Sequence, residues 1–182
     1  MDQIAMADTD IRPLGPSPAI RATLTELLIE AVANGGSVSF MDPLPVETAD
    51  QFWEGALAAA ARGDRIILGA FDGELLVGTV TVVLDLSQNQ PHRAEIVKMI
   101  TRISHRGRGV ATALLHRAEK MALARGRTLL VLDTASDGGA APLYESVGFK
   151  FAGEIPDYAL KPQGGLTGTK FYWKHLAAPA AA

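Results

Sequence analysis

Two spacings of apolar residues alternate along this chain, and each change of spacing marks the border of an expected element. Apolar positions that recur every three or four residues predict helices. Glycine or Asn-Gly pairs follow the first two of these stretches, and Thr48 is a candidate cap for the second. The helices expected from this spacing cover residues 18–33, 48–62, 107–125 and 140–147.

Runs of apolar and β-branched residues predict the strands, and Asp72-Gly73 predicts a hairpin turn between two of them. Residues 94–134 read as strand, helix and strand, which requires a parallel pair with a right-handed crossover. The expected fold class is therefore α/β (α+β), with a mixed sheet and flanking helices. The expected strands cover residues 11–14, 65–71, 74–86, 94–103, 128–134, 150–153 and 169–173.

Composition narrows the class of protein. The 182 residues suit one domain, with 48% hydrophobic and 20% charged residues. A net charge of −3 argues against a nucleic-acid binder, and the absence of cysteine excludes disulfides and thiolate metal sites. No apolar run reaches membrane-spanning length. We expect a single cytoplasmic domain over residues 1–182, with flexible ends at 1–10 and 177–182, and with no nucleic-acid, membrane or metal partner.

The loop Arg106-Gly107-Arg108-Gly109-Val110-Ala111 is the most informative motif, because it joins an expected strand to an expected helix. Glycines let the backbone turn tightly, and the N–H groups of a first helical turn converge with the positive end of the helix dipole. Such a loop suits a pyrophosphate. A P-loop would need Lys where Val110 stands, and a dinucleotide fingerprint would need a third glycine where Thr112 stands.

The acyl-CoA signature Arg/Gln-x-x-Gly-x-Gly/Ala fits better, through Arg106-x-x-Gly109-x-Ala111. A second signature follows, Ala140-x-x-x-Tyr144-x-x-x-Gly148-Phe149. With both in this order, the chain resembles the GNAT superfamily of N-acetyltransferases. The resemblance implies acetyl-CoA as acetyl donor and a mostly antiparallel sheet with a splayed central parallel pair.

Residues 33–41, 93–99 and 132–134 are similar to the branch of the superfamily that contains tabtoxin-resistance acetyltransferases. This implies N-acetylation of a small amine-bearing molecule, such as an amino-acid-like toxin or an antibiotic. Ile103 replaces a proline frequent before the loop, and Asp137 stands where many members carry an asparagine that faces CoA. The pattern leaves the identity of the acceptor open, as well as the choice between monomer and homodimer.

The resemblance implies how the donor lies. The pyrophosphate would sit on the N–H groups of residues 108–112, and the pantetheine arm would pair like an added strand with residues 99–101. A backbone N–H near Ile100 would face the oxyanion. The expected cofactor-binding residues are Met99, Ile100, Thr101, Arg106, Gly107, Arg108, Gly109, Val110, Ala111, Thr112 and Asp137.

Three side chains are candidates for catalysis. Glu95 lies in a largely apolar strand, where regular alternation places it on one face with Met99, and it is a candidate base or a solvated charge paired with Arg93. Asp133 ends a parallel strand, and is a second candidate base or a turn residue. The resemblance implies that the Tyr144 hydroxyl is the acid at the CoA sulfur; a core tyrosine is the alternative.

Other features are read as structural. Lys98 is expected to form a structural ion pair, and the histidines show no metal-ligand spacing. Acceptor pockets are expected in two loop-like segments, 34–45 and 154–168. A non-catalytic CoA-binding sensor on the same fold is the alternative function, and a dinucleotide-dependent oxidoreductase is a distant third. Three aromatic residues and one methionine would either line an acceptor pocket or fill the core: Phe40, Met41, Trp53 and Tyr158.

Overall fold

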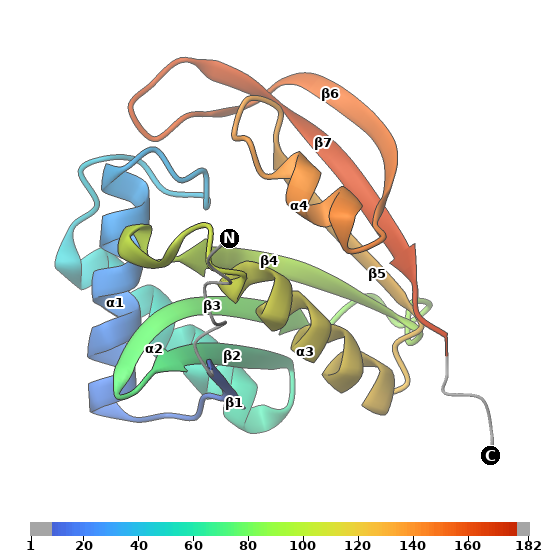
Figure 1. Ribbon diagram of the computed structural model, residues 1–182, viewed down its shortest axis with the longest axis horizontal. Helices are drawn as coiled ribbons and strands as arrows, with labels where there is room; N and C mark the ends of the chain where they lie inside the picture. Colours follow the sequence, from blue (N-terminus) through green and yellow to red (C-terminus); the bar gives the residue numbers. More distant parts are fainter. Residues whose placement is uncertain (1–8, 178–182) are drawn as a thin grey trace, which may run out of the picture.

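The computed structural model describes residues 9–177, which form seven strands and four α-helices around one mixed sheet (Figure 1). In chain order the elements are β1 (Asp10–Pro13), α1 (Pro18–Ala33), α2 (Val46–Arg62), β2 (Arg65–Asp72), β3 (Leu75–Val83), β4 (Arg93–Thr101), a 3-10 turn (Ile103–His105), α3 (Val110–Ala124), β5 (Leu129–Ala135), α4 (Ala141–Ser146), β6 (Lys150–Leu160) and β7 (Leu166–His175).

The sheet has the strand order β1-β2-β3-β4-β5-β7-β6, and only β4 and β5 run parallel. Helices α1 and α2 cover one face, and α3 covers the other (Figure 1). Two apolar clusters fill these interfaces. One joins β2–β5 to α3 and α4, and the other joins α1 and α2 to β2–β4 around the fully buried Trp53. The expected fold class, with its central parallel pair, is confirmed.

The parallel strands separate soon after they meet. β4 and β5 pair only over Arg93–Glu95 and Leu129–Val131, whereas β5 pairs with β7 along its whole length. Beyond Glu95, the edge of β4 that faces β5 has no strand partner. The separation opens the sheet in its middle, next to the beginning of α3.

Helix α3 lies very close to the sheet at Gly78 of β3. A Cβ atom added there would lie 2.9 Å from a methyl carbon of Val110, 3.0 Å from the carbonyl oxygen of Ile100 and 3.1 Å from Leu114. A backbone oxygen cannot move aside cheaply. The absence of a side chain at Gly78 therefore sets the height of the first turn of α3 above β4.

Several expected borders were wrong. Helix α2 begins at Val46 behind Pro45, so Thr48 lies inside the helix and is not its cap. β3 ends at Val83 and not at residue 86, and α3 begins at Val110 because Gly107 and Gly109 stay in the loop. β4 covers 93–101 in place of 94–103.

The largest difference concerns the segment 154–168, expected as a loop. It is mostly strand, because β6 and β7 form a long hairpin. Pro156 and the positive φ of Asp157 interrupt the pairing of β6 at a register shift between Ile155 and Ala159, which explains the loop-like sequence.

The expected flexible ends fall mostly outside the described residues, although Asp10 belongs to β1. Over residues 9–177, no helix combines the length and the apolar character needed to cross a membrane.

Substituting Gly78 should test the contact of α3 with the sheet. We expect Gly78→Ala to lower the free energy of unfolding by about 1–3 kcal/mol, because the new methyl group meets a backbone oxygen. Gly55→Ala is the matched control, since a Cβ atom there meets nothing within 4 Å. It should raise stability by about 0.5–1 kcal/mol through helix propensity. Urea denaturation measures both; equal effects would contradict the close contact.

Candidate functional site

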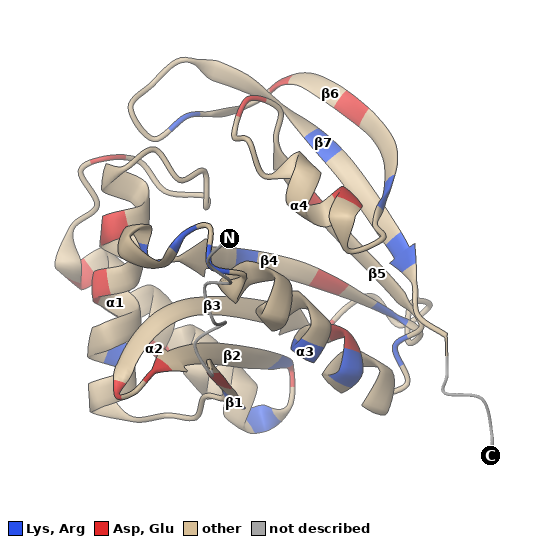
Figure 2. Ribbon diagram, in the orientation of Figure 1, with Lys and Arg blue, Asp and Glu red and all other residues tan. Residues whose placement is uncertain are grey.

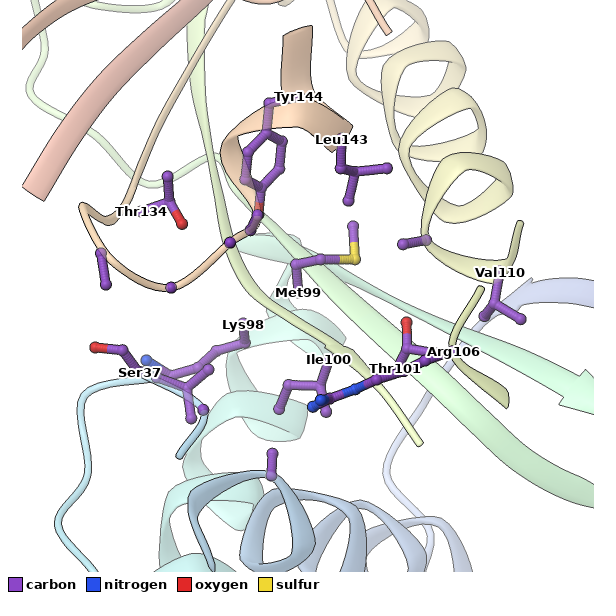
Figure 3. A pocket seen from close by; sticks show the side chains of 18 of the residues that line it. Ser37, Lys98, Met99, Ile100, Thr101, Arg106, Val110, Thr134, Leu143 and Tyr144 are labelled. Carbon is purple, nitrogen blue, oxygen red and sulfur yellow. The ribbon is translucent and has the colours of Figure 1, made fainter. Parts of the chain in front are cut away.

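A cavity of about 720 Å³ occupies the opening between β4 and β5. Its walls come from the end of α1 and the loop after it, from β4, from the glycine loop and first turn of α3, from β5, and from α4 (Figure 3). Six consecutive β4 residues, 96–101, line it. The cavity therefore joins the separated strands to a helix N-terminus, two features that the sequence analysis treated as one site.

The glycine loop forms one end of this cavity. Gly107 and Gly109 have φ values of 72° and 81°, and a Cβ atom added to either would meet nothing within 4 Å. The N–H groups of residues 110–112 precede the first helical hydrogen bond, which Ala113 N donates to Gly109 O. They lie at the positive end of the α3 dipole, so this end of the cavity suits an anion.

Basic side chains surround the same end. Arg106 lines the cavity, and Figure 2 shows basic residues along the loop between β4 and α3. His105 also lines it, and its Nε2 lies 3.2 Å from a carboxylate oxygen of Asp72. Arg108 is exposed and is not among the lining residues. The anion end thus combines backbone donors with one arginine of the two in the motif.

A β-bulge explains why consecutive residues of β4 reach the cavity. From the pair Thr81–Val97 to the pair Thr79–Ile100, the chain moves two residues along β3 but three along β4, so β4 holds one extra residue. Within this bulge, Lys98 has a φ of 53°. Ala94 and Ile96 pack in the core cluster under α3, whereas Ile100 packs under α1 and α2. The bulge therefore reverses the alternation of faces midway along β4.

This reversal corrects the expected position of Glu95. Met99 packs against the α3 cluster, as Ala94 and Ile96 do, so Glu95 and Met99 point to opposite faces. The Glu95 carboxylate pairs with Arg93 at 2.8 Å and does not line the cavity. The surroundings of Glu95 therefore match the alternative expected from the sequence, a charged side chain paired with Arg93.

Tyr144 of α4 lies on the other side of the cavity from β4. Its side chain is buried, with ring contacts to Phe149 and Tyr172, and Figure 3 shows its hydroxyl directed into the cavity. Within residues 9–177 this hydroxyl has no hydrogen-bond partner. Burial, with a smaller effect from the Asp133 carboxylate, raises the pKa of Tyr144 to about 12. The group therefore stays a proton donor at neutral pH.

Asp133 stands where β5 leaves β4. Its Oδ2 accepts a hydrogen bond of 2.9 Å from the Thr169 hydroxyl on β7. It lines the main cavity and also a smaller recess of about 120 Å³ under the β6–β7 hairpin. Because its charge affects the pKa values of both Tyr144 and Lys98, the three groups share one electrostatic neighbourhood.

Lys98 is the residue that the sequence analysis missed, because regular alternation placed it away from the site. It lines the cavity (Figure 3). Its Nζ donates a hydrogen bond of 3.1 Å to Ser39 Oγ in the loop after α1. Desolvation lowers the pKa of Lys98, with Asp133 acting in the opposite direction. The expected ion pair of Lys98 is absent from residues 9–177.

Other expected site residues lie elsewhere. Asp137 pairs with Lys161 at 3.3 Å and accepts a 2.7 Å hydrogen bond from Thr167, which lowers its pKa, and it does not line the cavity. Trp53 is core, whereas Tyr158 lines the smaller recess. The expected residues that do line the main cavity are Met99, Ile100, Thr101, Arg106, Gly107, Gly109, Val110, Ala111, Thr112, Asp133 and Tyr144.

The arrangement offers four chemical functions within one cavity. The helix end can bind an anion, and the unpaired edge of β4 can hydrogen-bond an extended chain. Tyr144 supplies a protonated hydroxyl, and Asp133 supplies a carboxylate beside a polar recess. Such a set suits the transfer of a group from a long, phosphate-bearing donor to a small acceptor.

Comparison with known proteins agrees with this arrangement. The family model described as the acetyltransferase (GNAT) family matches residues 29–149. Streptothricin acetyltransferase of Escherichia coli is 32% identical over 113 residues, which cover 60% of this chain and 63% of that protein. N-acetylaspartate synthetase of Danio rerio is 35% identical over 82 residues, 44% of this chain and 29% of that protein. The match thus spans less than two thirds of either relative.

Among solved structures, the protein yncA from Salmonella typhimurium, determined with its cofactor acetyl-CoA, has a TM-score of 0.74 at 21% identity. The likeness covers 94% of this chain and 96% of that one, so the two share a fold.

The raised pKa of Tyr144 leads to a measurable result. In the ring NMR spectrum of ¹³C-tyrosine-labelled protein, the signal lost in Tyr144→Phe should titrate near pH 12 and not near 10. Because the unfolded chain releases this proton at the lower pH, stability should fall between these values by about 1.4 kcal/mol per pH unit. A Tyr144 signal that titrates at the ordinary value would contradict burial as the cause.

Proposed function

Because the chain belongs to the acetyltransferase (GNAT) family, we propose that it transfers the acetyl group of acetyl-CoA to a primary amine of a small molecule. One observation carries the proposal. The cavity that begins at the helix N-terminus continues along the unpaired edge of β4 and ends between Tyr144 and Asp133. A phosphate site, a binding edge for an extended arm and two groups that exchange protons therefore follow one another in the order that acetyl-CoA requires.

The glycine loop fits the phosphates of the donor. The open space beside Gly107 and Gly109 leaves room for phosphate oxygens at the N–H groups of residues 110–112, and Arg106 adds a positive charge. Residues 99–101 offer backbone groups to the amide-bearing arm, as a sheet edge does to a peptide. Bound this way, acetyl-CoA supplies an activated acetyl group as a thioester, next to Tyr144.

Side chains of this protein then accept and donate the protons of the proposed reaction. Asp133 accepts a proton from the acceptor amine, directly or through water, so that the nitrogen lone pair can attack the carbonyl carbon. A backbone N–H near Ile100 stabilises the negative charge on the carbonyl oxygen. Tyr144 donates its hydroxyl hydrogen toward the sulfur as the carbon–sulfur bond breaks, and the second proton that the former ammonium nitrogen loses passes through water and restores the Tyr144 hydroxyl. The products are an amide and free CoA.

Asp133 is a better-supported base than Glu95. Asp133 lines both the cavity and the recess in which an acceptor fits, whereas Glu95 is held by Arg93 off the cavity. Glu95 stays the alternative base.

The acceptor is proposed to be an amino-acid-like molecule or an antibiotic. The relation to streptothricin acetyltransferase and the resemblance to the tabtoxin-resistance branch support this class, and so does the small size of the recess. A CoA-binding sensor would need the loop but neither Asp133 nor Tyr144. Acetyl transfer to amines distinguishes the enzyme from the sensor.

Binding of the donor tests the glycine loop. Acetyl-CoA at 100 times its Kd should stabilise the chain by about 2.7 kcal/mol, measured by thermal unfolding. Gly109→Asp should abolish this gain, because a carboxylate would occupy the phosphate site, while Arg106→Ala should only weaken it. Gly63→Asp is the control, since Gly63 has a similar φ of 87° and equally open surroundings away from the cavity. Wild-type affinity in Gly109→Asp would place the phosphates elsewhere.

Turnover tests the proton-transfer groups. Tyr144→Phe keeps the ring and removes the hydroxyl, so kcat should fall by about 10²–10⁴-fold while acetyl-CoA affinity stays nearly unchanged. Asp133→Asn should lower kcat more than Glu95→Gln. Tyr172→Phe, which removes a hydroxyl bonded to Glu145 outside the cavity, should leave kcat near wild type. Unchanged kcat in Tyr144→Phe and in Asp133→Asn would leave proximity as the source of the rate.

A further inference from the structure

We propose that the acceptor carries a carboxylate close to its reacting amine, as amino acids do, and that Lys98 binds this carboxylate while Asp133 faces the amine. The inference rests on the proposed N-acetyltransferase function and names its acceptor class. It starts from a charged side chain in the cavity that donor binding and proton transfer leave unused.

The fold directs Lys98 into the cavity at a cost. Its positive φ is a strained conformation for a residue with a Cβ atom, and it lies at the bulge in the pairing of β4 with β3, just beyond the point where β4 separates from β5. The side chain then passes two aromatic rings, with Nζ 5.7 Å from the centre of Phe40 and 5.5 Å from the centre of Phe52. Ring faces and the Ser39 hydroxyl together hold the ammonium group in one place.

No protein carboxylate balances this charge directly. In the described part of the chain, Lys161 and Lys174 form ion pairs with Asp137 and Glu119, whereas Lys98 bonds only to a neutral hydroxyl. Its lowered pKa has desolvation as the largest cause, so the pull of Asp133 compensates burial only in part. A partly desolvated cation with an open donor position in a cavity favours an anionic ligand.

The distribution of charge in the cavity separates donor from acceptor. The charged or titratable lining residues are Lys98, His105, Arg106, Asp133 and Tyr144, the last of which is uncharged at neutral pH. His105 and Arg106 belong to the glycine loop, where the phosphates of the donor are proposed to bind. Lys98 and Asp133 are the remaining opposite charges, and they match the two charges of an amino acid.

The acceptor side is also small and polar. The recess of about 120 Å³ is lined by Asp133 and by hydroxyl groups of Ser37, Ser39, Tyr158 and Thr167. Ser39 is the residue that holds Lys98, so the recess and the ammonium group are adjacent. A single lysine suits one carboxylate better than a phosphate, for which proteins usually gather several donors. A diamine without a carboxylate would place a second cation beside Lys98.

The experiment compares matched acceptors. Acetyl transfer by the full chain is measured for a panel of L-amino acids, their carboxamides and their decarboxylated amines. We expect kcat/KM for the preferred amino acid to exceed that for its carboxamide by about 10-fold or more, as for a charge-assisted hydrogen bond. Lys98→Met, which has a similar unbranched shape, should lower this ratio to near one by raising KM for the amino acid.

Two further variants identify the cause. Lys98→Arg should keep part of the preference because it retains the charge. Lys120→Met removes an exposed lysine of α3 outside the cavity and should keep all of it. A wild-type ratio of one or less, an equal loss for every acceptor in Lys98→Met, or no transfer to any amino acid would overturn the inference.

These results are separable from failure of the proposed function. Stabilisation by acetyl-CoA together with acetylation of amides or plain amines would retain the N-acetyltransferase and reject the carboxylate. Absence of both acetyl-CoA stabilisation and acetyl transfer would reject the function itself.

Discussion

The early separation of β4 from β5 is the constraint on which the rest of the site depends. Three paired positions fix the two strands in parallel, their pairing ends at Glu95, and a bulge in the pairing of β4 with β3 follows at Lys98. The edge groups thus left without a strand partner must be satisfied by solvent or by a ligand. In the proposed mode of donor binding, the extended arm of acetyl-CoA would complete the sheet at this position, using the backbone groups that a further strand would use.

The same opening determines which groups can act together. α3 follows β4 through a short loop, so its N-terminus lies at one end of the opening, while α4 follows β5 and brings Tyr144 to the side facing β4. The close contact at Gly78 lets the first turn of α3 lie against β3, next to Ile100 of β4. Because Val110 and Ile100 also line the cavity, this contact helps to place the anion end beside β4.

Part of the fold and of the candidate site could be predicted from the sequence, because it depends on conformational preferences of short segments. The glycines of the loop need positive φ, and the parallel crossover follows from one strand–helix–strand run, so the anion end and the fold class could be expected from the residues, whereas the place of Tyr144 in the site was implied only by the resemblance to the GNAT superfamily. The bulge at Lys98 could not, because it depends on pairing with β3 and leaves no turn residue as a marker. Without it, alternation placed Glu95 in the site and Lys98 outside. Pro156 and Asp157 interrupt the pairing of β6, so this part of the sequence was similarly expected to be a loop.

In the proposed mechanism, the charge of Asp133 links the transfer of a proton to Asp133 with the transfer of a proton from Tyr144. A tyrosine whose pKa is about 12 is a weaker acid than an alkyl thiol, whose pKa is about 8.5, so complete transfer from Tyr144 to a departing thiolate is uphill by itself. In the proposed mechanism, the Asp133 carboxylate, which contributes less than burial to that raised pKa, would lose this influence once it had accepted the proton of the amine. Protonation of Asp133 would then lower the pKa of Tyr144 at the stage when the departing sulfur needs a proton. The proposed order of the two proton transfers thus depends on one carboxylate that lines both the smaller recess and the cavity that Tyr144 faces.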